Sequence, residues 1–426
     1  MNRADRGRPA QGGGRIATFA FVVFSPALAV ASTLQPPPDP SAARGPFAAA
    51  PSPAYPLAWL PVFNWSDSPV LLDLHQSGGF NDNILNSAPG RTPKASAVSR
   101  TEVGALGRLS LGPQRFFAQA RIAATDFLDD KSASRHDRQF DLGWDWRAGR
   151  NCAGRLAAAA SDKQAEAEQA SGPGLDTLRL RGVDQEGRCA LYGALGALFA
   201  AGGASRRHTA LAARALDADA VYGKLGLDYD VSTRDHAEIF ARAARTRFLE
   251  GREASALPRD ADKTDLEAAY RRVFSSALQA RAALGASQAP GPGDGRPRQV
   301  GTYGAELVFA PSDLWRAVLA ASRALGPPVS IRAAAQIAET QSLTLSWRAS
   351  AKLAFTASVA RLRLEGGPPA AGLYGGSTLT AVAGKAVYQL TPFTSLSASV
   401  QRVERRLAGG RVPTTVAMIG VDFKPY

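Results

Sequence analysis

The residue types that most often carry catalysis or bind metals are few and scattered in this 426-residue chain. His75, His136, His208 and His236 show neither the HxxxH nor the HExxH spacing of a metal site. The GxSxG turn of hydrolases is absent as well. Acidic residues are abundant, but most fall on segments of alternating polarity, where lining a polar surface is a simpler role than paired catalysis. We therefore expect no enzyme activity, no metal site and no cofactor.

Polar and apolar residues alternate in many segments. In residues 138–147, Phe140 and Leu142 fall on one face, whereas Asp141 and Asp145 fall on the other. The same rhythm recurs in residues 221–231, 264–271 and 342–348. Because a period of two residues places side chains on opposite faces of an extended chain, these segments are predicted β-strands. Their polar faces supply the candidates for lining a lumen: Glu102, Arg108, Arg121, Asp141, Asp145, Tyr222, Lys224, Asp228, Asp230, Asp265, Glu267, Arg271 and Glu306.

The connections between the strands indicate a membrane barrel rather than a soluble sandwich. Short turns alternate with longer polar or Gly- and Pro-rich stretches, which is the layout of outer-membrane barrels. We count about eighteen strands, with sixteen as the alternative, since bacterial barrels have an even number. The predicted fold is therefore all-β, a transmembrane antiparallel up-and-down β-barrel that occupies residues 68–426.

Aromatic residues gather where predicted strands meet turns. They are Phe116, Trp144, Trp146, Tyr229, Phe240, Phe248, Phe309, Trp315, Trp347 and Phe423. Outer-membrane barrels carry aromatic girdles at the lipid–water interface, so we expect these side chains to point toward lipid.

The N-terminus has the features of a secretory signal peptide. Arginines precede an apolar stretch at residues 16–30, and Ala29-Val30-Ala31 is a small-x-small cleavage site. Residues 1–31 are the predicted signal peptide, with a single membrane anchor as the alternative. Residues 32–67 are rich in Pro and Ala without any period, and they are predicted to be a disordered periplasmic segment. Export would place the barrel in the bacterial outer membrane, in contact with its lipid and lipopolysaccharide.

The formal net charge of +13 has two interpretations. An arginine excess can follow from a GC-rich genome, or it can form a cationic surface that faces an acidic polymer or the phosphates of lipopolysaccharide. An exported chain without the signature of a nucleic-acid-binding fold is not expected to bind nucleic acid.

The two cysteines, Cys152 and Cys189, test the strand assignment. Two thiols in an oxidising periplasm often pair. The predicted strands at 152–164, 176–185 and 188–201 would leave one strand between the cysteines. Their separation would then be roughly twice the ~4.8 Å strand spacing, more than the ~4.4–6.8 Å between Cα atoms that a disulfide tolerates. If the cysteines pair, the second and third of these strands are misplaced.

The segment Gly79-Phe80-Asn81-Asp82-Asn83-Ile84-Leu85 resembles the aromatic-Asp-Asp-Asn-aliphatic signature near the first strand of the EpsL type of exopolysaccharide-associated outer-membrane barrels. The order of features is similar too, with a Pro-rich lead-in, Trp144-Asp145-Trp146 at a strand end, the pair Arg206-Arg207 and regular hairpins to the C-terminus. The motif candidates are Phe80, Asn81, Asp82 and Asn83, and Asn81 departs from the usual Asp. The resemblance implies a role in the biosynthesis or export of extracellular polysaccharide, with periplasmic export proteins as partners.

Three functions are open on this basis. The leading hypothesis is a barrel for exopolysaccharide export that offers a polar lumen or docking wall. The others are a general solute porin and an outer-membrane hydrolase with an active site on the barrel rim. Large open-channel currents in a planar bilayer would favour the porin, and a nucleophile–base pair in the structure would favour the hydrolase.

Overall fold

The computed structural model describes residues 70–84, 92–165, 176–209, 217–249, 260–290, 297–326, 336–365, 377–407 and 410–424. The predicted signal peptide and periplasmic segment, residues 1–31 and 32–67, lie outside the described residues and stay predictions. Within the described ranges, no helix combines the length and the apolar character needed to cross a bilayer.

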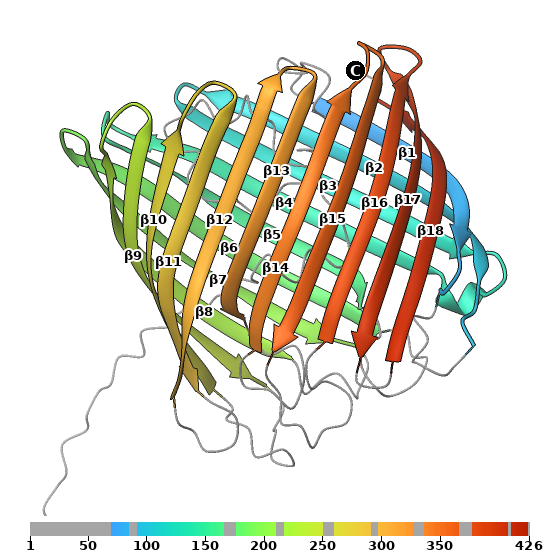
Figure 1. Ribbon diagram of the computed structural model, residues 1–426, viewed down its shortest axis with the longest axis horizontal. Helices are drawn as coiled ribbons and strands as arrows, with labels where there is room; N and C mark the ends of the chain where they lie inside the picture. The colour runs from blue at the N-terminus through green and yellow to red at the C-terminus, as the bar shows by residue number, and fades with distance from the viewer. Residues whose placement is uncertain are drawn as a thin grey trace, which may run out of the picture.

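Eighteen strands form one sheet that closes on itself (Figure 1). They are β1 (Val70–Asn81), β2 (Ser96–Leu111), β3 (Gln114–Phe127), β4 (Arg135–Ala148), β5 (Cys152–Ala165), β6 (Asp176–Tyr192), β7 (Leu195–His208), β8 (Ala218–Asp230), β9 (Asp235–Phe248), β10 (Asp260–Val273), β11 (Leu278–Pro290), β12 (Pro297–Ser312), β13 (Trp315–Gly326), β14 (Gln336–Arg348), β15 (Leu353–Glu365), β16 (Ser377–Gln389), β17 (Thr394–Leu407) and β18 (Gly410–Phe423). Consecutive strands pair antiparallel, and β1 also pairs with β18. The closed antiparallel barrel of eighteen strands is confirmed, and the sixteen-strand alternative is wrong.

The period-two pattern of the sequence places large apolar side chains on the outside of the barrel. Leu225, Leu284 and Ile419 each leave 70% or more of their surface exposed. Water disfavours such a surface, whereas the hydrocarbon core of a bilayer accepts it. The closed ladder also satisfies the backbone N–H and C=O groups of every strand internally, which is the condition for crossing lipid with strands.

The two ends of the barrel differ in the length of their connections. At the short-turn end, hairpins turn at residues 112–113, 149–151, 193–194, 231–234, 274–277, 313–314, 349–352 and 390–393. Gly112, Gly149 and Gly193 adopt φ angles of 59°, 63° and 56° there, a region that glycine occupies without steric cost. At the opposite end, which we call the long-loop end, successive strands are separated by more residues of sequence, and Lys131–Ala133 form a single turn of 3-10 helix. Figure 1 shows the short-turn end, together with the C-terminus, at the top.

The predicted strands 176–185 and 188–201 are wrong. A single long strand, β6, spans residues 176–192, and the hairpin turns at residues 193–194 instead of 186–187. Cys152 and Cys189 are therefore direct partners on neighbouring strands, with Cα atoms 4.1 Å apart, and they form a disulfide. Charged residues on both faces of β6 hide its alternation, and Gly187 beside the polar run Asp184-Gln185-Glu186 resembles a turn although the strand continues through it.

Most of the predicted girdle aromatics are exposed on the outer face at the short-turn end. Trp315, for example, stacks on Trp347 with ring centroids 5.3 Å apart. The prediction is wrong for Phe240 and Phe248, which occupy even-numbered positions of β9, whereas its lipid-facing side chains are odd-numbered. Phe248 is only 1% exposed, and the Lys224 ammonium lies 3.5 Å from the centroid of the Phe240 ring.

Candidate functional site

The register places all the candidate polar residues on the inner face of the barrel wall, opposite the exposed apolar side chains. They lie on β2 and β3 (Glu102, Arg108, Arg121), β4 (Asp141, Asp145), β8 (Tyr222, Lys224, Asp228, Asp230), β10 (Asp265, Glu267, Arg271) and β12 (Glu306). Their neighbours sort them into three groups around the wall. Within the described residues, Arg108 and Glu306 join none of these groups.

The first group joins β2 to β5. Glu102, which is 8% exposed, accepts hydrogen bonds from Arg121 Nε at 2.9 Å and from Arg100 Nη2 at 3.0 Å. Farther along the wall, Asp145 accepts a hydrogen bond from Arg155 Nε at 2.5 Å. The buried Glu102 is thus neutralised by two guanidinium groups, as a buried charge requires, and the partly exposed Asp145 by one. Asp141, which is 6% exposed, accepts instead from the Gln139 amide at 2.8 Å.

A second group reaches from β6 to β9 around Tyr222. The Tyr222 hydroxyl donates to Asp184 Oδ1 at 3.0 Å, and the Arg242 guanidinium lies 4.9 Å from the centroid of the Tyr222 ring. Asp184 and Tyr222 sit on β6 and β8, so their bond crosses β7. Gly202 on β7 makes this possible, since a Cβ atom there would lie 2.4 Å from Asp184 Oδ1. The result is an aromatic ring held by a hydrogen bond at its tip and by a cation over its face.

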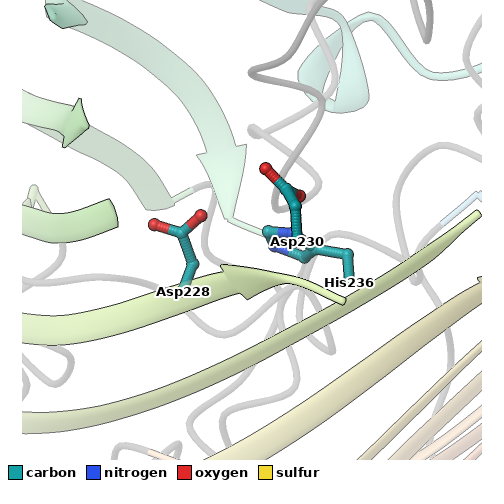
Figure 2. A group of neighbouring side chains, drawn as sticks. All are labelled: Asp228, Asp230 and His236. Carbon is teal, nitrogen blue, oxygen red and sulfur yellow. The ribbon is translucent and has the colours of Figure 1, made fainter. Parts of the chain in front are cut away.

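The short-turn end of β8 carries the most compact part of the second group. Figure 2 shows Asp228 and Asp230 rising from β8 and His236 of β9 beside Asp230. Arg188 of β6 donates to Asp228 Oδ2 from Nε at 2.7 Å and to Asp230 Oδ2 from Nη2 at 3.1 Å. His236 Nδ1 lies 2.7 Å from Asp230 Oδ1. Gly196 on β7 again leaves the space in which Arg188 meets Asp228, because a Cβ atom there would lie 2.3 Å from Asp228 Oδ1.

The same residues have the geometry of a potential metal site. Ligand atoms of Asp228, Asp230 and His236 all lie within 4.8 Å of one another. However, the Arg188 guanidinium already bonds to both carboxylates and supplies the positive charge. A divalent cation would have to displace it, so the donor set fits a fixed guanidinium better than a metal ion.

The third group lies on β9 to β11. The Lys263 ammonium lies 3.0 Å from Asp265 Oδ1, and the Ser287 hydroxyl donates to the same oxygen at 2.5 Å. Arg281 of β11 reaches Glu238 of β9 at 2.5 Å, passing over β10. The candidates Glu267 and Arg271 share this inner face of β10.

Sequence reasoning missed several members of these groups. Arg188, Asp184 and Glu186 all lie on the inner face of β6, in the region where the strands were misplaced. Their alternation with Gln185 and Gly187 is the signal that would have found them. Arg242 follows Tyr222 after one short turn. The sequence of the two strands does not show which residue of one lies beside which residue of the other.

The opposite part of the wall differs in chemistry. The inner face of β14 to β17 has few charges and, on β14, β15 and β17, many hydroxyl and amide side chains, interspersed with Ala, Leu and Val: Thr340, Ser342, Thr344, Ser346, Thr356, Ser358, Ser395, Ser397, Ser399 and Gln401. In these four described strands, the inner face has only three charged side chains, Arg348, Lys385 and Arg405. We call β2–β12 the charged sector and β14–β17 the hydroxyl sector.

The motif candidates lie at the seam, where the last strand meets the first. Thr415 N donates to Asp82 Oδ1 at 2.6 Å, and Asp82 N donates back to Thr415 O at 3.1 Å. Asn83, which is 1% exposed, donates from Nδ2 to Pro413 O at 3.3 Å, and its own N–H donates to Asn81 Oδ1 at 2.9 Å. These contacts extend the seam past Asn81, where the β1–β18 ladder ends. Phe80 points outward and is 51% exposed.

At the other end of the seam, charged and ionisable side chains join β1 to β18. His75 and Asp422 are direct partners on β1 and β18, and His75 Nδ1 lies 2.7 Å from Asp422 Oδ1. Asp422 is 3% exposed. Just past β18, burial lowers the pKa of Lys424, while the nearby Asp73 and Asp422 carboxylates act in the opposite direction. Both ends of the closure thus depend on specific polar side chains.

A closed antiparallel barrel of eighteen strands, apolar outside and polar inside, has the architecture of bacterial outer-membrane channels and transporters. No protein-family model matches the chain. No curated protein matches it either. The EpsL-type assignment therefore stays a resemblance.

Solved outer-membrane barrels are similar to the chain in fold. The siderophore receptor PirA of Pseudomonas aeruginosa is 9% identical, with a TM-score of 0.44 over 84% of this chain and 80% of that one. OccK3 (OpdO) of the same species is 10% identical, with a TM-score of 0.43 over 84% and 95%. A bacterial polysaccharide outer-membrane secretin is 10% identical, with a TM-score of 0.36 over 84% and 100%. These similarities are distant and concern the fold alone.

Proposed function

We propose that this barrel is exported with a cleaved signal peptide, inserts into the bacterial outer membrane and gives an extracellular polysaccharide a polar path across it. The observation that carries the proposal is the division of the inner wall into a charged sector and a hydroxyl sector. Barrels of 16–18 strands are wide enough for an aqueous channel. Periplasmic export proteins would deliver the polymer, and lipid and lipopolysaccharide would surround the wall.

The chemistry of the two sectors suits a sugar polymer. Serine and threonine hydroxyls both donate and accept hydrogen bonds, so a sugar hydroxyl can exchange one partner for the next without meeting a fixed charge. In the charged sector, ion pairs such as that of Glu102 with Arg121 neutralise many of the charges and so weaken its attraction for a charged polymer. Tyr222 and the Arg242 guanidinium over its ring together form a flat surface on the inner wall against which a sugar ring can rest.

Current blocking in planar bilayers tests the proposal. The purified protein is reconstituted, and its open-channel current is recorded with dextran oligomers or with polyethylene glycol of matched size. We expect the sugars to block the current with longer events than polyethylene glycol does. Equal blocking by both polymers, with a large steady current, would instead identify a general porin.

A pair of tyrosine variants assigns the blocking to the lumen. Tyr222→Ala removes the inner-face ring, whereas Tyr229→Ala removes a ring that is 50% exposed on the outer face of the same strand. We expect shorter sugar-blocking events for Tyr222→Ala and unchanged events for Tyr229→Ala. Unchanged events in both variants would count against Tyr222 as a sugar contact.

The hydrolase hypothesis gains no support from the described residues. His75 and His236 each bond to a carboxylate, and neither bonds to a serine hydroxyl. Cys152 and Cys189 are joined in a disulfide, which removes both thiols as nucleophiles.

A further inference from the structure

A shallow hollow of about 360 Å³ lies on the outer, lipid-facing wall over β4 to β8. It exists because the outward positions of β5 and β7 there are small. Ala158 and Ala160 of β5 and Ser205 of β7 line it between the large ring of Phe140 on β4 and Asp219 on β8. Its lining is mostly apolar, which fits a hydrocarbon chain.

Polarity rises in steps from this hollow toward the long-loop end. Three rows of outward-facing cross-strand partners run across β4, β5, β6 and β7. The first row is Leu142, Ala158, Val183 and Gly203, and the second is Phe140, Ala160, Arg181 and Ser205. The third row, nearest the long-loop end, is Arg138, Asp162, Arg179 and Arg207. Successive rows are two residues apart, or roughly 6.7 Å along the strands. An apolar groove therefore passes into a basic rim within the length of a lipid headgroup.

Several guanidinium groups of the rim form no ion pair with a described carboxylate. Arg207 is paired with Asp219, with Arg207 Nη2 2.7 Å from Asp219 Oδ1. In the described part of the chain, no carboxylate lies within ion-pairing distance of Arg138, Arg179 or Arg181, and all three are exposed. Guanidinium groups match the oxygen geometry of phosphates better than lysine does, and these rows contain no lysine.

We propose that this hollow and rim bind one molecule of lipopolysaccharide through its lipid A part, with an acyl chain in the hollow and a phosphate on Arg181 and its basic neighbours. The long-loop end faces the cell exterior in outer-membrane barrels, so the rim lies at the level of the outer-leaflet headgroups. A phosphorylated glycolipid supplies both the acyl chain and the phosphates at this level. The proposal goes beyond the lumen function, because every residue involved lies on the outer wall.

Native mass spectrometry of the purified full-length protein tests the proposal. Bisphosphorylated lipid A, dephosphorylated lipid A and phosphatidylglycerol are added at equal concentration. We expect bisphosphorylated lipid A to be retained most strongly. Arg181→Gln removes the charge at the rim and Ala158→Phe fills the hollow, and each is expected to weaken retention about tenfold, the loss typical of one charge-assisted hydrogen bond or a blocked pocket.

Arg245→Gln is the matched control. Arg245 is also an outward arginine toward the long-loop end, but both its Nε and Nη2 bond to Asp262, away from the hollow. The Arg245→Gln variant should retain lipid A as the unmodified protein does. Heat-dependent mobility on a gel verifies that every variant is folded. Equal retention of the dephosphorylated lipid or of phosphatidylglycerol, or unchanged retention by folded Arg181→Gln and Ala158→Phe, would overturn the proposal.

Discussion

At the scale of single residues, the seam depends on side chains that replace missing backbone bonds. Pro413 of β18 has no N–H to donate to a ladder, and its carbonyl accepts from the side chain of Asn83. Farther along the seam, Gly79 lies opposite Met418, and a Cβ atom there would collide with the Ala417 carbonyl oxygen. The motif that resembles EpsL-type barrels thus has a structural role in closing the sheet.

Asn83→Ala tests this role. The variant removes the buried Asn83 side chain and leaves the Pro413 carbonyl without this partner, so we expect a loss of about 1–3 kcal/mol in the free energy of unfolding. Urea unfolding in lipid vesicles measures the loss. Asn151→Ala, in an exposed hairpin turn, is the control and should change little. An Asn83→Ala barrel as stable as the control would contradict the role.

Arg188 gives a second prediction at the same scale. Its guanidinium is the partner of Asp228, whose side chain is fully buried. Arg188→Gln leaves that carboxylate unpaired, and we expect a destabilisation on the order of 3 kcal/mol. The double variant Arg188→Gln with Asp228→Asn should recover part of the loss, because the unpaired charge is gone. No loss in Arg188→Gln relative to Arg234→Gln, in an exposed turn, would show that the pair carries no stability.

At the scale of elements, the β5–β6 hairpin is held together by its backbone ladder and by a disulfide. Its ladder runs from Cys152 opposite Cys189 to Ala165 opposite Asp176, and the disulfide joins the partners at the short-turn end. The cysteines point outward with Leu156, on the face away from Arg155 and Glu186. The disulfide therefore pins the register of a strand whose own pattern is weak.

Replacing both cysteines by alanine tests the contribution of the disulfide. Closing a loop of this length stabilises a fold by about 2–4 kcal/mol, so the double variant should unfold at lower urea while the barrel still forms. In the unmodified protein, a thiol reagent should label Cys152 and Cys189 only after reduction and unfolding. Labelling of the native, unreduced protein would show that the two thiols are free.

At the scale of the whole molecule, the two sectors of the inner wall give the lumen an asymmetry. Ion pairs link strands at several places between β2 and β11, and both the Arg188–Asp228 ion pair and the Tyr222–Asp184 hydrogen bond cross β7, over Gly196 and Gly202. The hydroxyl sector has short side chains that extend little into the lumen. We expect the open path to run along the hydroxyl sector.

A tryptophan pair on β15 tests where the path runs. Ser358 faces inward between Thr344 and Ala383, and its neighbour Val359 faces outward with 46% of its surface exposed. Ser358→Trp should reduce the open-channel current several-fold, whereas Val359→Trp should leave it unchanged. Equal currents in the two variants would place the path elsewhere or show a closed barrel.

The inner-face placement of the candidates could be read from the sequence, but their partners could not. Alternation alone puts Asp228 and Asp230 on the face opposite Leu227 and Tyr229. Arg188 reaches them across β7 only because the turn lies at Gly193 and because Gly196 leaves the space. Both facts depend on the pairing of distant strands, which one sequence does not encode locally.

The sequence by itself determined the class of fold, because the two-residue polarity period predicts strands and the alternation of short turns with long connections distinguishes a membrane barrel from a soluble sandwich. Tertiary structure alone decided the register of β6, the disulfide, the inward direction of Phe240 and Phe248 and the role of Asp82 and Asn83 at the seam. Each of these depends on which residue of one strand lies opposite which residue of another. If the register of a strand shifted by one residue, every side chain of that strand would move to the opposite face of the sheet. Only the closed ladder excludes that shift.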